Sequence, residues 1–233
     1  MEHRISTEIH PPNRYPPRHT TQPISTEAPP TVPRASSPTP TFRGFPMTDI
    51  HGIIPAVNDF AQLRRFLESE YDLCVLMHSH IADLDEVFQC LKTVGKRGMV
   101  HIDLIRGLAA DEFGAEYLCG RYAPAGVIST RTPVITACRR LGVTAVQRCF
   151  LIDGSALEKS VAAIEKAKPD YVELLPALCT PLFPMLRARL GLPLIAGGLI
   201  QSKRMAQQIL KSGVDAVTIS MKTLCRPEQE AAT

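Results

Sequence analysis

Residues 126–150 read GVISTRTPVITACRRLGVTAVQRCF, and this stretch contains one complete strand–helix–strand unit. The apolar run Gly126–Thr130 is typical of a buried strand, because parallel strands covered on both faces lack polar alternation. Thr132–Pro133 favours the start of a helix and Gly142 favours its end. The apolar run Thr144–Phe150 then predicts the next strand. Since a helix joins the two strands, we expect them to lie parallel.

The same unit recurs along the chain. We expect eight strands, at Ile53–Val57, Leu73–Met77, Met99–Asp103, Gly126–Thr130, Thr144–Phe150, Tyr171–Leu175, Leu194–Gly197 and Ala216–Ser220. Eight repeats of strand and helix favour an α/β fold of the (βα)8 TIM-barrel type, with a short final helix. The alternative is a six-stranded doubly wound sheet. Its dinucleotide-binding form is disfavoured, because no Gly-x-Gly-x-x-Gly motif follows the first strand.

Small polar residues before the amphipathic stretches predict where helices begin. We expect N-caps at Asn58 or Asp59, Asp83, Thr132, Ser155 and Ser202. These side chains can accept a hydrogen bond from a free N–H group of the first helical turn.

Residues 1–48 differ in composition from the rest of the chain. They contain 11 of the 20 prolines, many Ser and Thr residues and the single glycine Gly44. Such a segment buries too little apolar surface to offset its ordering entropy. We therefore predict a disordered Pro-rich N-terminal tail over 1–48 and one barrel domain over 49–233.

Charge and cysteine usage limit the class of protein. The formal net charge of +3 is too small to create a strong global field for nucleic acid. The seven cysteines form no Cys-x-x-Cys pair, which is typical of reduced thiols in a cytosolic protein. No apolar run approaches the ~20 residues of a membrane span. We expect a cytoplasmic protein with no membrane partner, no metal and no cofactor.

Polar side chains at the ends of the expected strands mark a candidate ligand site, because barrels of this type bind ligands there. His101 and Asp103 end the third strand, and the period of two places both on one face. They are either satisfied interior groups or ligand contacts, and the cost of burying an unpaired carboxylate favours contact. The same argument applies to Glu173. Arg148 can pair with Glu173 or contact a ligand anion, and both roles stay open.

The seventh and eighth strands end in a pattern typical of phosphate binding. Gly197 and Gly198 have no Cβ, so the main chain can approach an anion closely. Ser220 adds a hydroxyl, and a helix starting near Met221 can direct N–H groups at the same anion. A tight turn also explains two glycines, but Ser220 and the strand register favour phosphate.

Blocks in a fixed order resemble the glycerol-3-phosphate responsive antiterminator family, the glycerol uptake operon antiterminators. The blocks are Val100–Ile105, Gly126–Arg131, Gln147–Arg148, Glu173–Pro176 and Ile195–Ile200. The resemblance runs from about Ile54 to Leu224. It implies a barrel that senses glycerol 3-phosphate and acts on leader mRNA of glycerol-utilisation genes, with a possible homodimer. The implied pocket residues are His101, Asp103, Arg131, Arg148, Glu173, Gly197, Gly198 and Ser220.

The function expected is thus a transcription antitermination regulator and not an enzyme, with no catalytic residues. The alternative is a barrel enzyme with epimerase-like or lyase-like acid–base chemistry on a phosphorylated small molecule, using Asp103 or Glu173 as general base. The RNA-binding surface is open. Basic pairs occur at Arg64–Arg65, Lys96–Arg97, Arg139–Arg140, Arg187 with Arg189, and Lys203–Arg204, and each is more often a solvated helix face.

Overall fold

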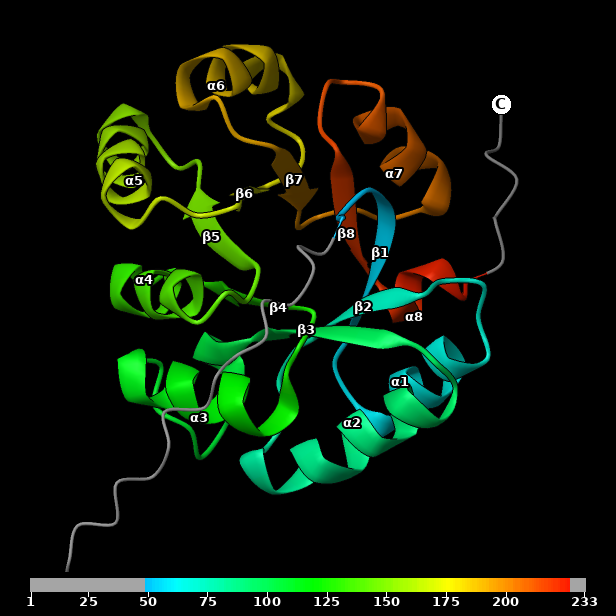
Figure 1. Ribbon diagram of the computed structural model, residues 1–233. Coiled ribbons are helices and arrows are strands. Elements are labelled where there is room, and N and C mark those ends of the chain that lie inside the picture. The colour runs from blue at the N-terminus through cyan, green and yellow to red at the C-terminus, as the bar shows by residue number, and fades with distance from the viewer. Residues whose placement is uncertain (1–48, 227–233) are drawn as a thin grey trace, which may run out of the picture. The chain divides into compact units, whose positions relative to one another are not determined.

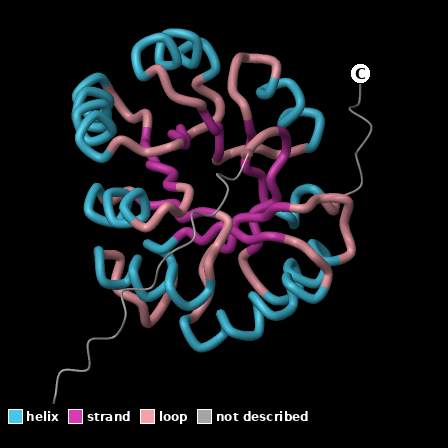
Figure 2. Tube along the Cα trace, in the orientation of Figure 1, coloured by secondary structure: helices cyan, strands magenta, loops and turns pink. Residues whose placement is uncertain are grey.

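The structure is a computed structural model that describes residues 49–226. In this part, eight parallel strands alternate with eight α-helices and close into a barrel in the order β1 to β8 (Figure 1). The strands form an inner ring that the helices surround (Figure 2). The predicted (βα)8 barrel is confirmed. The predicted tail over 1–48 and residues 227–233 lie outside the described residues.

Strands and helices follow one another in strict alternation. The strands are β1 (Gly52–Val57), β2 (Leu73–Leu76), β3 (Arg97–His101), β4 (Gly126–Ser129), β5 (Ala145–Phe150), β6 (Tyr171–Leu175), β7 (Leu194–Gly197) and β8 (Ala216–Ser220). The helices are α1 (Phe60–Leu67), α2 (Leu84–Thr93), α3 (Glu112–Tyr122), α4 (Thr132–Arg140), α5 (Gly154–Ala167), α6 (Phe183–Leu190), α7 (Lys203–Leu210) and the short α8 (Met221–Leu224). None of the described helices is long and apolar enough to cross a membrane.

The third strand begins and ends two residues earlier than predicted. β3 ends at His101, and Ile102–Leu104 form a 3-10 turn. Asp103 therefore lies beyond the strand, and the period-two argument that placed it on the same strand face as His101 is wrong. The carboxylate of Asp103 accepts hydrogen bonds from Ser129, the last residue of β4, and from Thr130, which follows it, and these bonds favour the turn over a strand that continues to Asp103.

Two of the predicted helix caps are also wrong. Asp153, and not Ser155, caps α5, because its Oδ1 accepts from the N–H of Ala156 at 2.7 Å. Thr132 is the first residue of α4, and Arg131 holds the N-cap position without a side-chain bond. Asp59 and Ser202 cap α1 and α7 as predicted. Asp83 precedes α2 but makes no capping bond.

One apolar cluster, here called the barrel plug, takes at least one residue from every strand and so fills the barrel interior. Its members are Ile50, Ile54, Leu73, Val75, Met99, Ile128, Val146, Tyr171, Ile195 and Ala216. They lie toward the N-terminal ends of the strands. Ile50 precedes β1, is 1% exposed, and donates its N–H to the Tyr171 hydroxyl at 3.2 Å. Two further clusters fill the space between strands and helices.

We expect Ile50→Ala to lower the free energy of unfolding by about 2–5 kcal/mol, because it leaves a cavity in the barrel plug. Urea unfolding followed by circular dichroism measures this, since the chain contains no tryptophan. Ile152→Ala is the matched control, because Ile152 is 79% exposed and its loss should change stability by less than about 0.5 kcal/mol. Equal stability of the two variants would contradict the role of Ile50.

Candidate functional site

The barrel interior becomes polar above the barrel plug. His101, Arg148, Glu173 and Thr218 each stand two residues beyond a plug residue on their own strand. The alternation of side chains along a strand therefore directs all four inward, near the C-terminal ends of the strands. Glu173 is fully buried, and His101 is 2% exposed.

The centre of this polar layer is the Glu173 carboxylate. Arg148 Nε donates to Glu173 Oε2 at 2.7 Å, and Thr218 Oγ1 donates to Glu173 Oε1 at 2.7 Å. Both carboxylate oxygens are thus bonded, which offsets the cost of removing the charge from water. Arg148 does pair with Glu173 from the adjacent strand. Thr218 was not predicted as a site residue, although its place two residues before Ser220 is the signal that identifies it.

A cavity of about 230 Å³ opens above this layer. Residues on its wall include Asn58, Arg148, Gly198, Leu199, Thr218 and Ser220. Of the candidates, Arg148, Gly198 and Ser220 meet on one wall, and Glu173 lies behind them through its bond to Arg148. The Arg148 terminal nitrogens have no partner among the described residues, so the guanidinium still has donors for an anion. The volume fits a small ligand, since drug-sized ligands occupy roughly 300–1,000 Å³.

The reason for glycine at position 197 differs from the one predicted. A Cβ on Gly197 would lie 2.4 Å from Thr218 Oγ1 and 3.0 Å from Glu173 Oε1. The space beside Gly197 is therefore filled by the Thr218–Glu173 hydrogen bond and is not open to a ligand. Gly198 adopts a φ of +80°, which favours glycine. The Gly197 carbonyl accepts from the N–H of Ala177 at 2.7 Å, which fixes the loop after β7.

His101 and Gln147 each hold a buried polar atom without a partner among the described residues. These atoms are His101 Nδ1 and Gln147 Oε1. Burial, with the nearby Arg148 charge as the next cause, lowers the pKa of His101 to about 4, although the carboxylates of Asp103 and Glu173 act in the opposite direction. The imidazole is therefore neutral near pH 7, and its unbonded nitrogen can exchange a hydrogen bond with a ligand hydroxyl.

Asp103 is held by the end of β4 and the residue after it. Its carboxylate accepts from Ser129 Oγ at 2.5 Å, from Thr130 N at 2.8 Å and from Thr130 Oγ1 at 2.7 Å. Burial raises the pKa of Asp103, but these hydrogen bonds outweigh that effect and hold it below its usual value. Arg131 is exposed and is not on the wall of the cavity. Its part in the site stays a prediction.

Among residues 49–226, no three His, Cys, Asp or Glu side chains are grouped so that they could hold a metal ion. The polar groups on the cavity wall are the Arg148 guanidinium, the side chains of Asn58, Thr218 and Ser220, and the amides of the loop after β7. Donors of this kind can form charge-assisted hydrogen bonds with an anion.

The chain is similar to known proteins over most of the residues that the structure describes. The family model for the glycerol-3-phosphate responsive antiterminator matches residues 53–225. The crystal structure of the glycerol uptake operon antiterminator regulatory protein from Listeria monocytogenes str. 4b F2365 is 36% identical, with a TM-score of 0.69, covering 72% of this chain and 90% of that chain. An antiterminator-related protein from Thermotoga maritima MSB8 is 28% identical, with a TM-score of 0.66, covering 76% and 98%. The uncharacterized protein YgcP of Escherichia coli K12 is 26% identical over 166 residues, covering 71% of this chain and 87% of YgcP.

We expect Gly197→Ala to lower the free energy of unfolding by about 1–3 kcal/mol, because its Cβ would press on Thr218 and Glu173. Gly154→Ala is the matched control. Its Cβ would meet no atom within 4 Å at the start of α5, so stability should stay equal or rise by up to about 1 kcal/mol. Chemical unfolding of both variants measures the difference, and a stable Gly197→Ala would refute the close packing.

The low pKa of His101 predicts a pH dependence of stability. Below pH 6.5 the unfolded chain binds a proton at this residue and the folded chain does not, so stability falls as pH decreases toward 4. The full effect is about 3 kcal/mol. The free energy of unfolding, measured between pH 6.5 and 4, should depend less steeply on pH in His101→Gln than in the wild type. His78→Gln is the control, since His78 is exposed, and it should keep the wild-type slope. If the pH dependence is unchanged in His101→Gln, another residue takes up the proton on unfolding.

Proposed function

The chain belongs to the glycerol-3-phosphate responsive antiterminator family, and from this premise we propose that it is a cytoplasmic antitermination regulator of glycerol-utilisation genes. It senses glycerol 3-phosphate in the cavity at the barrel mouth and acts on leader mRNA. The observation that carries this proposal is Arg148, a nearly buried cation that is fixed by Glu173 and also lines the cavity beside Ser220.

The phosphate group binds where the loop after β7 meets the end of β8. Arg148 supplies the charge, and Ser220 supplies a hydroxyl that caps no helix. The N–H groups of Leu199 and Ile200 in that loop have no hydrogen-bond partner among the described residues, so they are available as donors. Gly198 keeps this loop close to the cavity through its positive φ. Charge-assisted bonds of this kind are short and strong.

The glycerol hydroxyls bind on the side of the polar layer. His101 offers its unbonded Nδ1, and Asp103 and Glu173 hold the layer in place. Binding then shifts a population of loops, or of a homodimer, toward a state competent to bind RNA.

Regulation is favoured over catalysis by the state of the two carboxylates. A general base must lie within hydrogen-bond reach of the proton that it takes from a substrate. Both oxygens of Glu173 already accept hydrogen bonds from protein groups, and Asp103 accepts three. Neither carboxylate lies on the wall of the cavity, so neither is placed to act as a base there.

Calorimetry with glycerol 3-phosphate tests the proposal. We expect binding by the wild type, and Ser220→Ala should weaken it roughly 10- to 150-fold, because one hydrogen bond to a charged oxygen is lost. Ser212→Ala is the matched control, since its hydroxyl donates to Ile209 O after α7, at the opposite end of the barrel. Glycerol and inorganic phosphate serve as partial ligands. Absence of heat with glycerol 3-phosphate at millimolar concentration would exclude the proposed sensor.

A further inference from the structure

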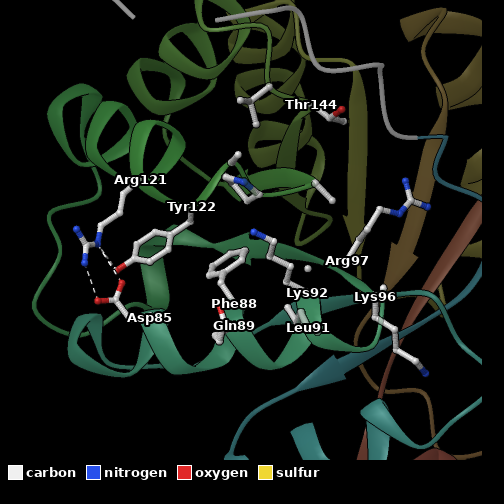
Figure 3. A pocket seen from close by; sticks show the side chains of 16 residues that line it. Asp85, Phe88, Gln89, Leu91, Lys92, Lys96, Arg97, Arg121, Tyr122 and Thr144 are labelled. Carbon is white, nitrogen blue, oxygen red and sulfur yellow. Dashed lines mark hydrogen bonds and ion pairs between the residues drawn. The ribbon is translucent and has the colours of Figure 1, made fainter.

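A second and larger hollow, here called the basal cleft, lies at the N-terminal ends of β3 and β4, with α2 and α3 beside it (Figure 3). Its volume is about 710 Å³. The side chains that matter for its chemistry are Asp85, Phe88, Lys92, Arg97, Arg121 and Tyr122. The cleft is at the opposite end of the strands from the proposed ligand cavity, so it does not belong to that site.

The charge of the basal cleft is positive and uncompensated. Asp85 is the one carboxylate among its lining residues, and Arg121 binds both of its oxygens, with Nε–Oδ1 at 3.0 Å and Nη2–Oδ2 at 2.6 Å. The side chains of Lys92 and Arg97 are exposed and have no ion-pair or hydrogen-bond partner among the described residues. Figure 3 shows the Lys92 side chain directed across the cleft between the aromatic rings and Arg97. Two cations are thus left to meet an anionic partner.

One wall of the basal cleft is aromatic. The rings of Phe88 on α2 and Tyr122 on α3 are stacked, with centroids 5.0 Å apart and an interplanar angle of 17°. Tyr117 contacts Tyr122 edge-on at 6.3 Å. Both stacked residues are partly exposed. Single-stranded nucleic acids bind to surfaces that combine such stacking platforms with cations for the backbone.

The other basic pairs of the sequence are less suited to this role. Most of their members are bound to carboxylates, in the pairs Arg139–Asp170, Arg140–Glu116, Arg187–Asp215, Arg189–Glu158 and Lys203–Glu70. Arg65 borders a hollow that also contains Glu68 and Glu70, whose charges repel phosphate. Lys96 donates its ammonium to Phe66 O at 2.9 Å and Ser69 O at 2.6 Å and is directed away from the basal cleft (Figure 3).

We propose that the basal cleft binds a single-stranded segment of RNA, with one base against the Phe88–Tyr122 stack and phosphates against Lys92 and Arg97. This inference rests on the proposed function, which requires an RNA partner. β3 connects the basal cleft with the polar layer at the barrel mouth, because Arg97 begins this strand and His101 ends it. A ligand at the barrel mouth and RNA at the base therefore both act on one short strand.

Fluorescence anisotropy of the full-length protein with labelled single-stranded RNA of mixed sequence, over a series of salt concentrations, tests the role of the two cations. For Lys92→Ala/Arg97→Ala we expect weaker binding and a plot of log K against log salt that is shallower by about 1.4, or ~0.7 for each phosphate that is no longer neutralised. Lys159→Ala/Arg204→Ala is the matched control. It removes the same charge from exposed positions on α5 and α7 and should keep the wild-type slope.

The aromatic platform is tested separately. Phe88→Ala should weaken RNA binding on the order of 5- to 150-fold without changing the salt slope, because it removes stacking and leaves the charge unchanged. Phe113→Ala is the control, since Phe113 on α3 is 69% exposed and lies outside the basal cleft. A thermal melt of each variant checks folding. If Phe88→Ala does not fold, the exposed Lys92 and Arg97 pair decides the question alone.

The outcomes separate the two proposals. If the wild type binds no RNA, with or without glycerol 3-phosphate, both the proposed regulatory function and RNA binding in the basal cleft are overturned. If Lys92→Ala/Arg97→Ala binds RNA as the wild type does, or if the control pair loses as much binding, RNA does not bind in the basal cleft. The proposed regulatory function would then still stand. Binding of an acidic peptide in place of RNA, abolished in Lys92→Ala/Arg97→Ala, would assign the cleft to a protein partner and overturn the RNA inference.

Discussion

The buried carboxylate of Glu173 is the constraint on which the polar half of the barrel depends. A charge at the centre of a closed sheet is tolerated only when both oxygens are bonded, and Arg148 and Thr218 supply those bonds. The same three groups leave no room for a Cβ at position 197. Glu173 also fixes the Arg148 guanidinium at the cavity wall, and the charges of these two residues act, after burial, on the pKa of His101. One ion pair thus sets the geometry of the proposed ligand site.

The interior of the barrel is apolar near the N-terminal ends of the strands and polar near their C-terminal ends. The barrel plug fills the part near the N-terminal ends of the strands with apolar side chains, and polar groups begin two residues later on each strand that contributes to the site. A packed floor excludes water from below, so electrostatic interactions above it are less screened. The cavity is small and lies at the strand ends beside the loop after β7. These features suit recognition of a small charged ligand.

The two proposed binding regions use opposite ends of one sheet. The mouth offers a cation that is held by a carboxylate, whereas the basal cleft offers cations with no carboxylate partner among the described residues. The first arrangement fits a single phosphate group in a defined orientation, and the second fits a flexible polyanion. β3 extends from one region to the other, so a shift of this strand on ligand binding is a direct physical route between them.

The sequence alone determined the strands, the closed barrel and the family, because continuous apolar runs and helix stops depend on local residue order. It also found Arg148 and Glu173, because a carboxylate in an apolar strand is costly to bury and an arginine on the adjacent strand can pair with it. Only the tertiary structure decided that Asp103 lies beyond β3, that Gly197 makes room for Thr218 and Glu173, and that Arg131 is not on the wall of the cavity. The basal cleft likewise joins Phe88 to Tyr122 from separate helices. Hydrophobic periodicity shows which face of an element is buried, but it does not show which residues of distant segments contact one another. Those contacts are decided by how the elements pack in the folded chain.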